Sequence, residues 1–224
     1  MMVTGLTRKV FLLLLALLLA GIPLPRGLSQ GGADSQIAFR WAFIHQSPNS
    51  ENEVIDFAER PTVNSGDKLQ IYLRPESEVY LYLFLYDTHK DLYLLFPESP
   101  DYYTSTKLEE GDIYIPGKFD WFEWDDSRGT ERIYLLASSE RLTDIEEKTK
   151  RYMNSNQDAK LKSQLYDAIV EMLKEKSNLT TPTEKPVAIA GTIRTRGSGT
   201  DMAGNAILVE AESFYSKTLR LRHE

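Results

Sequence analysis

The chain has 224 residues, of which 26 are basic and 33 acidic, so its formal net charge is −7. It contains no cysteine, which excludes disulfides, thiolate metal sites and a thiol nucleophile. The acidic balance argues against nucleic-acid binding, because that function needs a basic surface that neutralises phosphates. It argues equally against an anionic membrane surface as the main partner.

The N-terminal segment has the pattern of an export signal. A basic start precedes an uninterrupted apolar run over residues 10–20, which helix breakers end at Gly21. This run is shorter than the roughly 20 apolar residues that a membrane helix needs. We therefore predict a signal peptide over residues 1–30, cleaved near Ser29, and an uncleaved N-terminal anchor is the alternative.

Cleavage would remove three basic residues, leaving 23 basic and 33 acidic ones and a net charge of −10. An exported chain without cysteine is typical of the bacterial envelope, so we expect a periplasmic or secreted protein. No later segment is apolar enough to span a membrane.

The remaining chain, residues 31–224, is predicted to form a single globular domain. Alternating or continuous apolar runs predict strands at residues 37–44, 68–73, 79–86, 92–96, 112–115, 119–124 and 132–137. The run at 79–86 is apolar on both faces, so its strand is expected to be buried on both sides or lined by tyrosine on one. The polar residues Asp87 to Asp91 are predicted to turn it into a hairpin with the next strand.

The periodicity then changes to that of helices, predicted at about residues 143–153 and 157–176. Thr143 and Glu146 have the spacing of a capping box, and Asn156 is expected to cap the second helix. The second helix carries its apolar side chains on one stripe, which is expected to pack on a sheet.

Extended segments return after the helices, at residues 187–194, 206–211 and 214–221, with a glycine-rich loop over 197–205. The alternation changes phase near Glu212, which predicts a bulge or a tight turn there. The predicted fold class is mainly β (α+β): an antiparallel, sandwich-like domain with two amphipathic helices inserted before the last strands.

Several short motifs follow one another in a fixed order between residues 41 and 142. In chain order they are Trp41-Ala42-Phe43-Ile44, Gly66-Asp67, Tyr80-Leu81-Tyr82-Leu83-Phe84, Leu95-Phe96-Pro97, Gly111 with Tyr114-Ile115-Pro116, Gly129-Thr130-Glu131 and Leu136-Ala137-Ser138. In this order they resemble the bacterial domain of unknown function 4384. The resemblance implies a mainly β domain of envelope and signalling proteins with no established activity, and it carries over no catalytic residue. Thr88-His89-Lys90 departs from it, since a glycine is expected in that turn.

Five aromatic residues form the candidate binding surface, namely Tyr102, Tyr103, Trp121, Phe122 and Trp124. Aromatic faces flanked by carboxylates can stack on sugar rings or anchor a partner protein. Packing is the favoured alternative, because aromatic side chains mostly bury themselves.

Other patterns give no catalytic residue, cofactor or metal. Asp87, His89 and Asp91 could hold a metal ion, but a solvated turn is favoured because no second histidine lies nearby in the sequence. The Gly-x-Ser-x-Gly elbow of serine hydrolases is missing.

The predicted function is that of an exported bacterial envelope module that binds an unknown envelope protein or a polymer such as a glycan, without enzymatic activity. The alternative is a carbohydrate-binding module or a weak glycosidase that uses the aromatic and acidic region 121–131, with Asp125, Asp126 or Glu131 as its carboxylates. Glu131 has a competing interpretation, in which it accepts hydrogen bonds from the backbone amides of a turn.

Overall fold

A computed structural model describes residues 36–48, 50–105, 111–176, 181–189 and 204–224. These residues belong to one compact unit, Ser35–Glu224. The predicted signal peptide and most of the predicted glycine-rich loop lie outside the described residues. No helix in the described ranges combines the length and the hydropathy that a membrane span requires.

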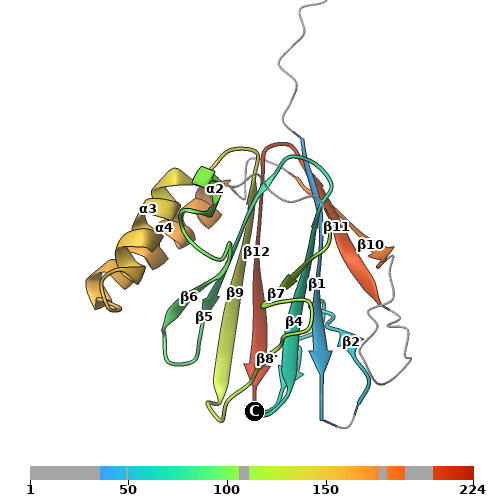
Figure 1. The fold of residues 1–224 in the computed structure, drawn as a ribbon. Helices are drawn as coiled ribbons and strands as arrows, with labels where there is room; N and C mark the ends of the chain where they lie inside the picture. Colours follow the sequence, from blue (N-terminus) through green and yellow to red (C-terminus); the bar gives the residue numbers. More distant parts are fainter. Residues whose placement is uncertain (1–35, 49, 106–110, 177–180, 190–203) are drawn as a thin grey trace, which may run out of the picture. The chain divides into compact units, whose positions relative to one another are not determined.

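Strands with inward-facing apolar residues at alternate positions build two sheets (Figure 1). The first sheet has the order β10 (Thr183–Ala188), β11 (Asn205–Ala211), β1 (Ile37–Gln46), β4 (Lys68–Pro75) and β7 (Ile113–Ile115). β2 (Glu53–Val54) pairs with β1 on the same edge as β11, further along the strand. β8 (Phe122–Glu123) pairs with β4 on the same edge as β7. Every pairing in this sheet is antiparallel.

The second sheet has the order β3 (Thr62–Val63), β12 (Phe214–His223), β9 (Gly129–Ser138), β5 (Tyr80–Tyr86) and β6 (Leu92–Phe96). Its pairings are antiparallel except for the short parallel contact between β3 and β12. β11 belongs to the first sheet and β12 to the second, so the chain crosses between the sheets at Glu212. A bend at Glu212 and Ser213 makes this crossing, which explains the change of phase in the sequence.

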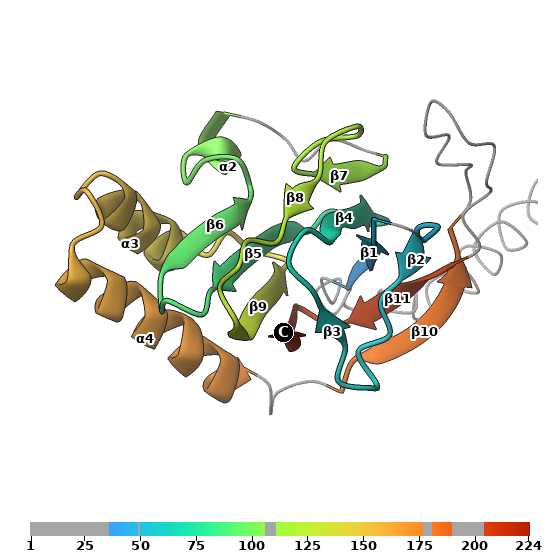
Figure 2. The same ribbon diagram turned by 90° about the horizontal axis from the view of Figure 1, so that it is seen from below.

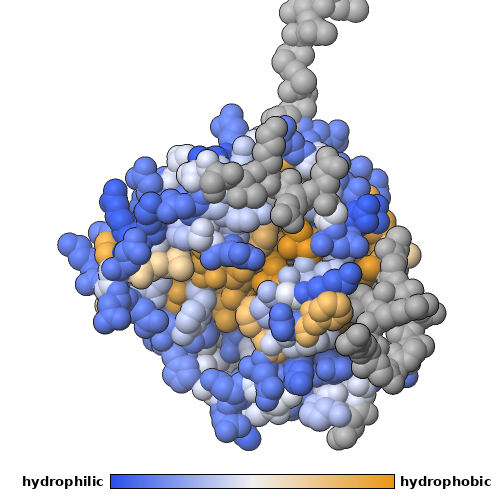
Figure 3. Space-filling view, in the orientation of Figure 1, coloured by the Kyte–Doolittle hydropathy of each residue, from blue (hydrophilic) through white to orange (hydrophobic). Residues whose placement is uncertain are grey.

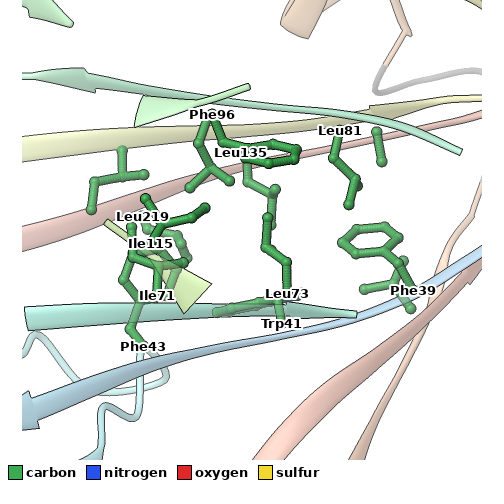
Figure 4. Packing of buried hydrophobic residues seen from close by; sticks show 14 of the residues in the cluster. Phe39, Trp41, Phe43, Ile71, Leu73, Leu81, Phe96, Ile115, Leu135 and Leu219 are labelled. Atoms are coloured by element: carbon green, nitrogen blue, oxygen red, sulfur yellow. The ribbon is translucent and has the colours of Figure 1, made fainter. Parts of the chain in front are cut away.

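The main core lies between the two sheets, as Figure 4 shows. β1 contributes Phe39, Trp41 and Phe43, which meet Leu135 of β9 and Leu219 of β12. These side chains are nearly inaccessible to solvent. Burying a large apolar side chain stabilises the fold by about 1.5–3 kcal/mol, so this layer is the principal source of stability.

Three helices, α2 (Tyr102–Ser105), α3 (Thr143–Met153) and α4 (Ala159–Lys176), lie on the outer face of the second sheet (Figure 2). Tyr82 and Phe84 of β5 pack there against Ile145, Leu165 and Ile169 of the helices. β5 is therefore buried on both faces, as predicted. The predicted fold class, a sandwich with two helices inserted before the last strands, is confirmed.

The predicted helix caps are wrong, although both helices form where expected. Leu142 occupies the cap position of α3, and no side chain caps this end. Glu146 points inward instead, where it accepts a hydrogen bond of 2.6 Å from the hydroxyl of Tyr82 and pairs with Arg141. The buried Tyr82 hydroxyl needs a hydrogen-bond acceptor, and Glu146 fills this role instead of capping the start of α3.

The second helix begins with Asp158 rather than Asn156 as its cap. The Oδ1 atom of Asp158 accepts hydrogen bonds from the backbone amides of Lys160 and Leu161, each at 2.9 Å. Asn156 has a positive φ of 52° and lies in the turn between α3 and α4.

The strands predicted at 119–124 and 187–194 have clearly different bounds in the structure. The strand predicted at 119–124 is reduced to Phe122–Glu123, because a turn between Gly117 and Asp120 precedes it and leaves Phe119 78% exposed. The strand predicted at 187–194 begins earlier, at Thr183, where pairing with β11 starts. β10 tolerates Pro186 because it is an edge strand. Residues 190–194 lie outside the described residues.

Candidate functional site

The five aromatic residues predicted as a binding surface lie in three separate clusters. Tyr102 and Tyr103 pack in the layer between the second sheet and the helices, and Trp121 packs on the outer face of the first sheet. Phe122 and Trp124 pack against the core between the sheets. All five are buried or half-buried, and no single surface contains them. Their role in binding stays a prediction.

Tyr103 illustrates a structural role for one of these aromatics. Its hydroxyl accepts a hydrogen bond of 3.0 Å from the Leu81 amide and donates one of 2.8 Å to the Leu81 carbonyl. Burial raises the pKa of this hydroxyl, so it remains a donor. Tyr103 thereby holds α2 against β5.

Exposed apolar side chains occur elsewhere on the described surface. Tyr93, Phe119 and Met153 are the large hydrophobic residues that solvent reaches most, and none of them belongs to the predicted set. Figure 3 shows hydrophobic residues in a band across the middle of one face, with hydrophilic residues above and below it.

A groove of about 620 Å³ opens along the side of the sandwich where β10, the last strand of the first sheet, faces β12 of the second. Alternation along β1 turns Trp41 toward this opening, and alternation along β12 turns Lys217 toward it. Pairing of Pro186 with Ile207 places both on the wall formed by the first sheet. The loop after β2 closes one end with Ile55 to Ala58.

An ion pair crosses the mouth of this groove. Glu184 Oε2 lies 2.5 Å from Lys217 Nζ, and its Oε1 accepts a hydrogen bond of 2.9 Å from the Tyr215 hydroxyl. Lys217 Nζ also lies 5.4 Å from the ring centroid of Trp41, a cation–π distance. Burial and the charge of Glu184 raise the pKa of Tyr215, which therefore stays a donor. The groove therefore combines the aromatic ring of Trp41 with the carboxylate of Glu184 and the ammonium group of Lys217, which hold each other in place.

The rim of the groove is acidic. Glu53 and Asp56 line it, and in the described part of the chain neither has a lysine or arginine partner. Glu53 contacts His45 at 3.0 Å, and Asp56 accepts the amide of Ala58. Since Lys217 is neutralised by Glu184, the rim keeps an excess of negative charge.

β12 presents an incompletely paired edge beside the groove. β9 pairs along its whole length on one side, whereas β3 pairs on the other side only with Arg222 and His223. The amide of Arg222 donates toward β3, to the Pro61 carbonyl at 3.0 Å. Because the direction alternates along a strand, the amides of Ser216, Thr218 and Arg220 point to the same edge. No backbone group in the described residues pairs with them there.

A second region of interest is the end of the core where the tight turn from Asn64 to Asp67 precedes β4. Gly66 has a φ of +83° in this turn, a conformation that side-chain-bearing residues rarely adopt. Asp67 Oδ2 accepts the Asn64 amide at 2.8 Å and lies 2.9 Å from His45 Nε2. Burial alone raises the pKa of Asp67, but the Asn64 amide and His45 outweigh it, so that the pKa is lowered.

Glu131, His223 and Trp124 meet at the same end of the core. Glu131 lies opposite Leu221 and Gly129 opposite His223, which makes Glu131 and His223 diagonal neighbours on the inner face of the sheet. The rings of Trp124 and His223 lie 5.6 Å apart. Three buried polar atoms there, Oε2 of Glu131, Nδ1 of His223 and Nε1 of Trp124, have no hydrogen-bond partner among the described residues.

We predicted that backbone amides of a turn donate hydrogen bonds to Glu131. This prediction is wrong for Oε2, which has no partner among the described residues. Burial, and then the charges of Asp87 and Asp125, raise the pKa of Glu131 to about 7. Gly129, in the same Gly-Thr-Glu motif, has no room for a side chain, because a Cβ atom there would lie 2.8 Å from the Thr88 methyl group.

The remaining acidic candidates have local partners. Asp87 Oδ1 accepts the Asp91 amide at 2.7 Å, and Asp91 pairs with Lys162 at 2.7 Å. In the ranges that the structure describes, no group of three or more histidine and carboxylate side chains could hold a metal ion. Asp125 accepts the Ser127 amide at 2.7 Å, and Asp126 is exposed.

Residues 62–141 match the model of a family described as Domain of unknown function (DUF4384). The chain therefore contains a DUF4384 domain over this segment, as the resemblance predicted. No curated protein and no solved structure matches the chain. The matched segment contains Asp67 and Glu131, whereas every residue that lines the groove lies outside it.

The groove could not be found from the sequence. Trp41, Glu184 and Lys217 are far apart along the chain, and no short motif links them. Pairing of β1 with β11 and of β11 with β10 brings Trp41 and Glu184 to one opening, which Lys217 reaches from β12 of the second sheet.

Proposed function

We propose that this chain is an exported module of the bacterial envelope that binds a protein partner without enzymatic activity, and that the groove between β10 and β12 is its binding site. The observation that carries the proposal is the groove itself, with the Trp41 floor under the Glu184–Lys217 pair. Aromatic residues set among oriented charges are typical of the anchoring points of protein interfaces. The N-terminal pattern supports export.

The test uses a photoreactive residue at Ala58, which is exposed and lines the groove. We expect the protein, expressed in its native bacterium, to form one discrete adduct from position 58. The matched control is Ala159, which is exposed at the start of α4. An equal adduct from position 159, or none from position 58, would contradict the proposal.

Affinity for the partner identified in this way gives the quantitative readout. Ala58→Arg should fill part of the groove and weaken binding by about tenfold or more, as steric blocking of an interface centre does. Ala159→Arg should leave the affinity within about twofold, because exposed positions outside an interface are near neutral. Cell fractionation and N-terminal sequencing of the mature protein test export and cleavage near Ser29.

A second function, carbohydrate binding with weak glycosidase activity, is favoured by one observation. The pKa of Glu131 is raised to about 7, whereas hydrogen bonds from the backbone and hydroxyl of Ser127 lower that of Asp125. Carboxylates whose pKa values are pushed apart suit the roles of acid and base. Burial of Glu131 Oε2 stands against this function, since a glycosidic oxygen would have to reach it.

The second function is tested with the mature protein on peptidoglycan fragments and β-linked oligosaccharides. Release of reducing ends that disappears in Glu131→Gln would support it. Hydrolysis that persists in Glu131→Gln, or no hydrolysis at all, would exclude a catalytic role for Glu131.

A further inference from the structure

We infer that the outer face of β9 and β12 binds a phosphate group of a soluble ligand between Arg132 and Arg220. This site lies on the face of the second sheet opposite to the groove, so it goes beyond the proposed function and can fail without it. Three features of the structure lead to it: the distribution of arginine ion pairs, the placement of Arg132 opposite Arg220, and the contact that orients Arg132.

The arginines of the described residues fall into two groups. Away from the paired ends of β9 and β12, each forms an ion pair with a carboxylate, namely Arg40, Arg74, Arg141 and Arg151. Those without a carboxylate partner among the described residues are Arg60, Arg128, Arg132 and Arg220.

The second group gathers at one end of the second sheet. Arg128 directly precedes β9, which contains Arg132, and Arg220 lies near the end of β12. Arg60 precedes Pro61, whose carbonyl accepts the amide of Arg222 in β12 at 3.0 Å. Figure 1 shows the ends of β9 and β12 side by side, next to the C-terminus. The chain without its predicted signal peptide has 23 basic and 33 acidic residues, so this gathering of unpaired arginines is a local reversal of its charge.

Arg132 and Arg220 occupy directly opposite positions on the two strands. Their neighbours Ile133, Leu219 and Leu221 belong to the core between the sheets, so alternation turns both arginines to the outer face. Opposite residues have their Cβ atoms about 4.5–5.5 Å apart, and like charges at this separation repel each other. An anion bound between the two guanidinium groups replaces this repulsion with two attractive contacts.

A contact with α4 orients Arg132. Its Nη1 atom lies 3.5 Å from the hydroxyl of Tyr166, whose ring packs against that of Tyr86 with 4.7 Å between the centroids. Arg132 is half-buried, whereas Arg220 is exposed. A guanidinium group that is already held in place loses less conformational freedom when it binds a ligand. Arg132 is therefore the fixed part of the site, and Arg220 completes it from the exposed side.

Two carboxylates are the nearest competitors along the same elements. Glu224 Oε1 lies 2.9 Å from Arg222 Nε, and Asp167, next to Tyr166 on α4, accepts the hydroxyl of Ser163 at 3.3 Å. Among the described residues neither forms an ion pair with Arg132 or Arg220. Arg222 is neutralised by Glu224, so the charge offered to a ligand comes from the unpaired arginines.

Phosphate fits this pair better than a carboxylate does. The planar fork of a guanidinium group matches two oxygens of either anion. A single carboxylate gains little at an exposed charge, whereas a phosphate monoester carries a charge of about −1.5 to −2 and three acceptor oxygens. It can therefore bind both guanidinium groups at once. The negative charge of the whole chain repels an extended anionic surface, which favours a soluble ligand over a membrane.

A hollow of about 450 Å³ provides room for the rest of the ligand. It lies where β9 begins and β12 ends, and Arg128, Thr130 and Arg222 are among its lining residues. Thr130 lies opposite Arg222, one pair of outward residues beyond Arg132 and Arg220. Its exposed hydroxyl adds a hydrogen-bonding group beside the two arginines.

The experiment titrates glycerol phosphate into the isotope-labelled mature chain and follows the arginine Nε–H signals by NMR. We expect the signals of Arg132 and Arg220 to shift together and to saturate, while those of Arg74 and Arg141, which carboxylates hold, stay in place. Sodium chloride and sodium acetate at equal ionic strength are the controls. Equal shifts of all four arginines, a shift without saturation, or equally tight binding of acetate would overturn the inference.

Substitutions separate a binding role of the arginine pair from a structural one. Arg220→Gln and Arg132→Gln should each weaken glycerol phosphate binding by about tenfold or more, because one phosphate needs both guanidinium groups. The matched control Arg151→Gln, at an exposed arginine of α3, should bind within about twofold of the parent. Without ligand, Arg220→Gln should unfold at the same temperature as the parent or at a higher one, since it removes a like charge opposite Arg132. Unchanged binding by Arg220→Gln would overturn the inference.

Vesicles test the source of the phosphate. We expect the protein to stay in solution when vesicles of phosphatidylglycerol or of phosphatidylcholine are sedimented. Sedimentation with phosphatidylglycerol vesicles alone, abolished by Arg220→Gln, would place the phosphate on a membrane and overturn the assignment to a soluble ligand. The proposed function is tested separately by cross-linking at position 58, so failure of phosphate binding leaves the groove as a partner site.

Discussion

Two carboxylate–histidine groups lie at the same end of the core and behave in opposite ways. Asp67 is 2% exposed and contacts His45, and Glu131 is 5% exposed beside His223. Yet the pKa of Asp67 is lowered, whereas that of Glu131 is raised to about 7. Burial is the largest single influence on both groups and acts in the same direction on both.

The two carboxyl groups differ in their hydrogen-bond partners, which account for the lowered pKa of Asp67. Asp67 accepts a hydrogen bond from the Asn64 amide and lies within hydrogen-bond distance of a ring nitrogen of His45. These contacts stabilise its ionised form. Burial and the charges of Asp87 and Asp125 oppose the ionisation of Glu131. One carboxylate therefore anchors a turn, and the other is a destabilising group that the fold tolerates at neutral pH.

Removing the compensated carboxylate should have the largest effect. Asp67→Ala leaves His45 Nε2 and the Asn64 amide without an acceptor, which should lower the free energy of unfolding by about 3 kcal/mol at pH 7. Urea denaturation measures the loss, and Asp126→Ala, at an exposed position, is the control. A loss no larger than that of the control would contradict the role of Asp67 as an anchor.

The same carboxylate predicts an acid-dependent loss of stability. Because the pKa of Asp67 is lower in the folded state than its usual 3.8, its contribution is complete above this value and disappears as the pH falls through the folded pKa. The parent protein should therefore lose more stability than Asp67→Ala between pH 5 and about pH 2. Parallel pH profiles of the two proteins would argue against this linkage.

Neutralising Glu131 should change the free energy of unfolding by a smaller amount than the loss of Asp67 does, and in the opposite direction. The pKa of Glu131 rises from 4.5 to about 7 on folding, so stability falls as the pH rises through this interval and stays low above it. Glu131→Gln should raise the free energy of unfolding by about 2 kcal/mol at pH 8 and change it little at pH 4. Glu123→Gln, at an exposed position, is the matched control, and equal effects of Glu131→Gln at both pH values would refute the assignment.

Replacing the indole beside His223 should change stability less. Trp124 Nε1 is buried without a partner among the described residues, so Trp124→Phe removes an unsatisfied donor and keeps an aromatic ring. We expect a change within about 1 kcal/mol by thermal unfolding, because the gain offsets lost packing. A loss comparable to that of Trp124→Ala would mean that the donor is satisfied in solution.

The smallest effect is expected for the outer partner of His45. Glu53 is 68% exposed where it contacts the ring, so Glu53→Gln should change stability by less than about 1 kcal/mol. Measured beside Asp67→Ala, it tests whether the buried contact dominates the group. A loss as large as that of Asp67→Ala would show that both contacts matter equally.

Local pattern was sufficient for most of the secondary structure. The continuous apolar run of β5 predicted burial on both faces, and the stripe on the second helix predicted its packing against a sheet. Local rules failed where a side chain interacts with a residue far away in the sequence. Glu146 was predicted to cap the start of α3, but it accepts a hydrogen bond from the buried hydroxyl of Tyr82 instead. They also failed for Glu131, because the lack of a donor is a property of the assembled core.

The candidate site was less accessible to sequence reasoning than the fold. Trp121 and Trp124 are close in sequence, but they pack on opposite faces of the first sheet. The groove depends instead on which strands become the outer ones. That outcome follows from the order of strands in both sheets, which periodicity does not specify.

The DUF4384 segment is smaller than the structure that it helps to build. Residues 62–141 contribute strands to both sheets but omit β1, which separates β11 from β4, and β12, which separates β3 from β9. A fragment cut at these limits would uncover β4 and β9, two long and largely apolar strands whose edges invite aggregation. Recombination or truncation that treats the segment as an independent unit should therefore yield insoluble protein, so inheritance must preserve the flanking strands together with it.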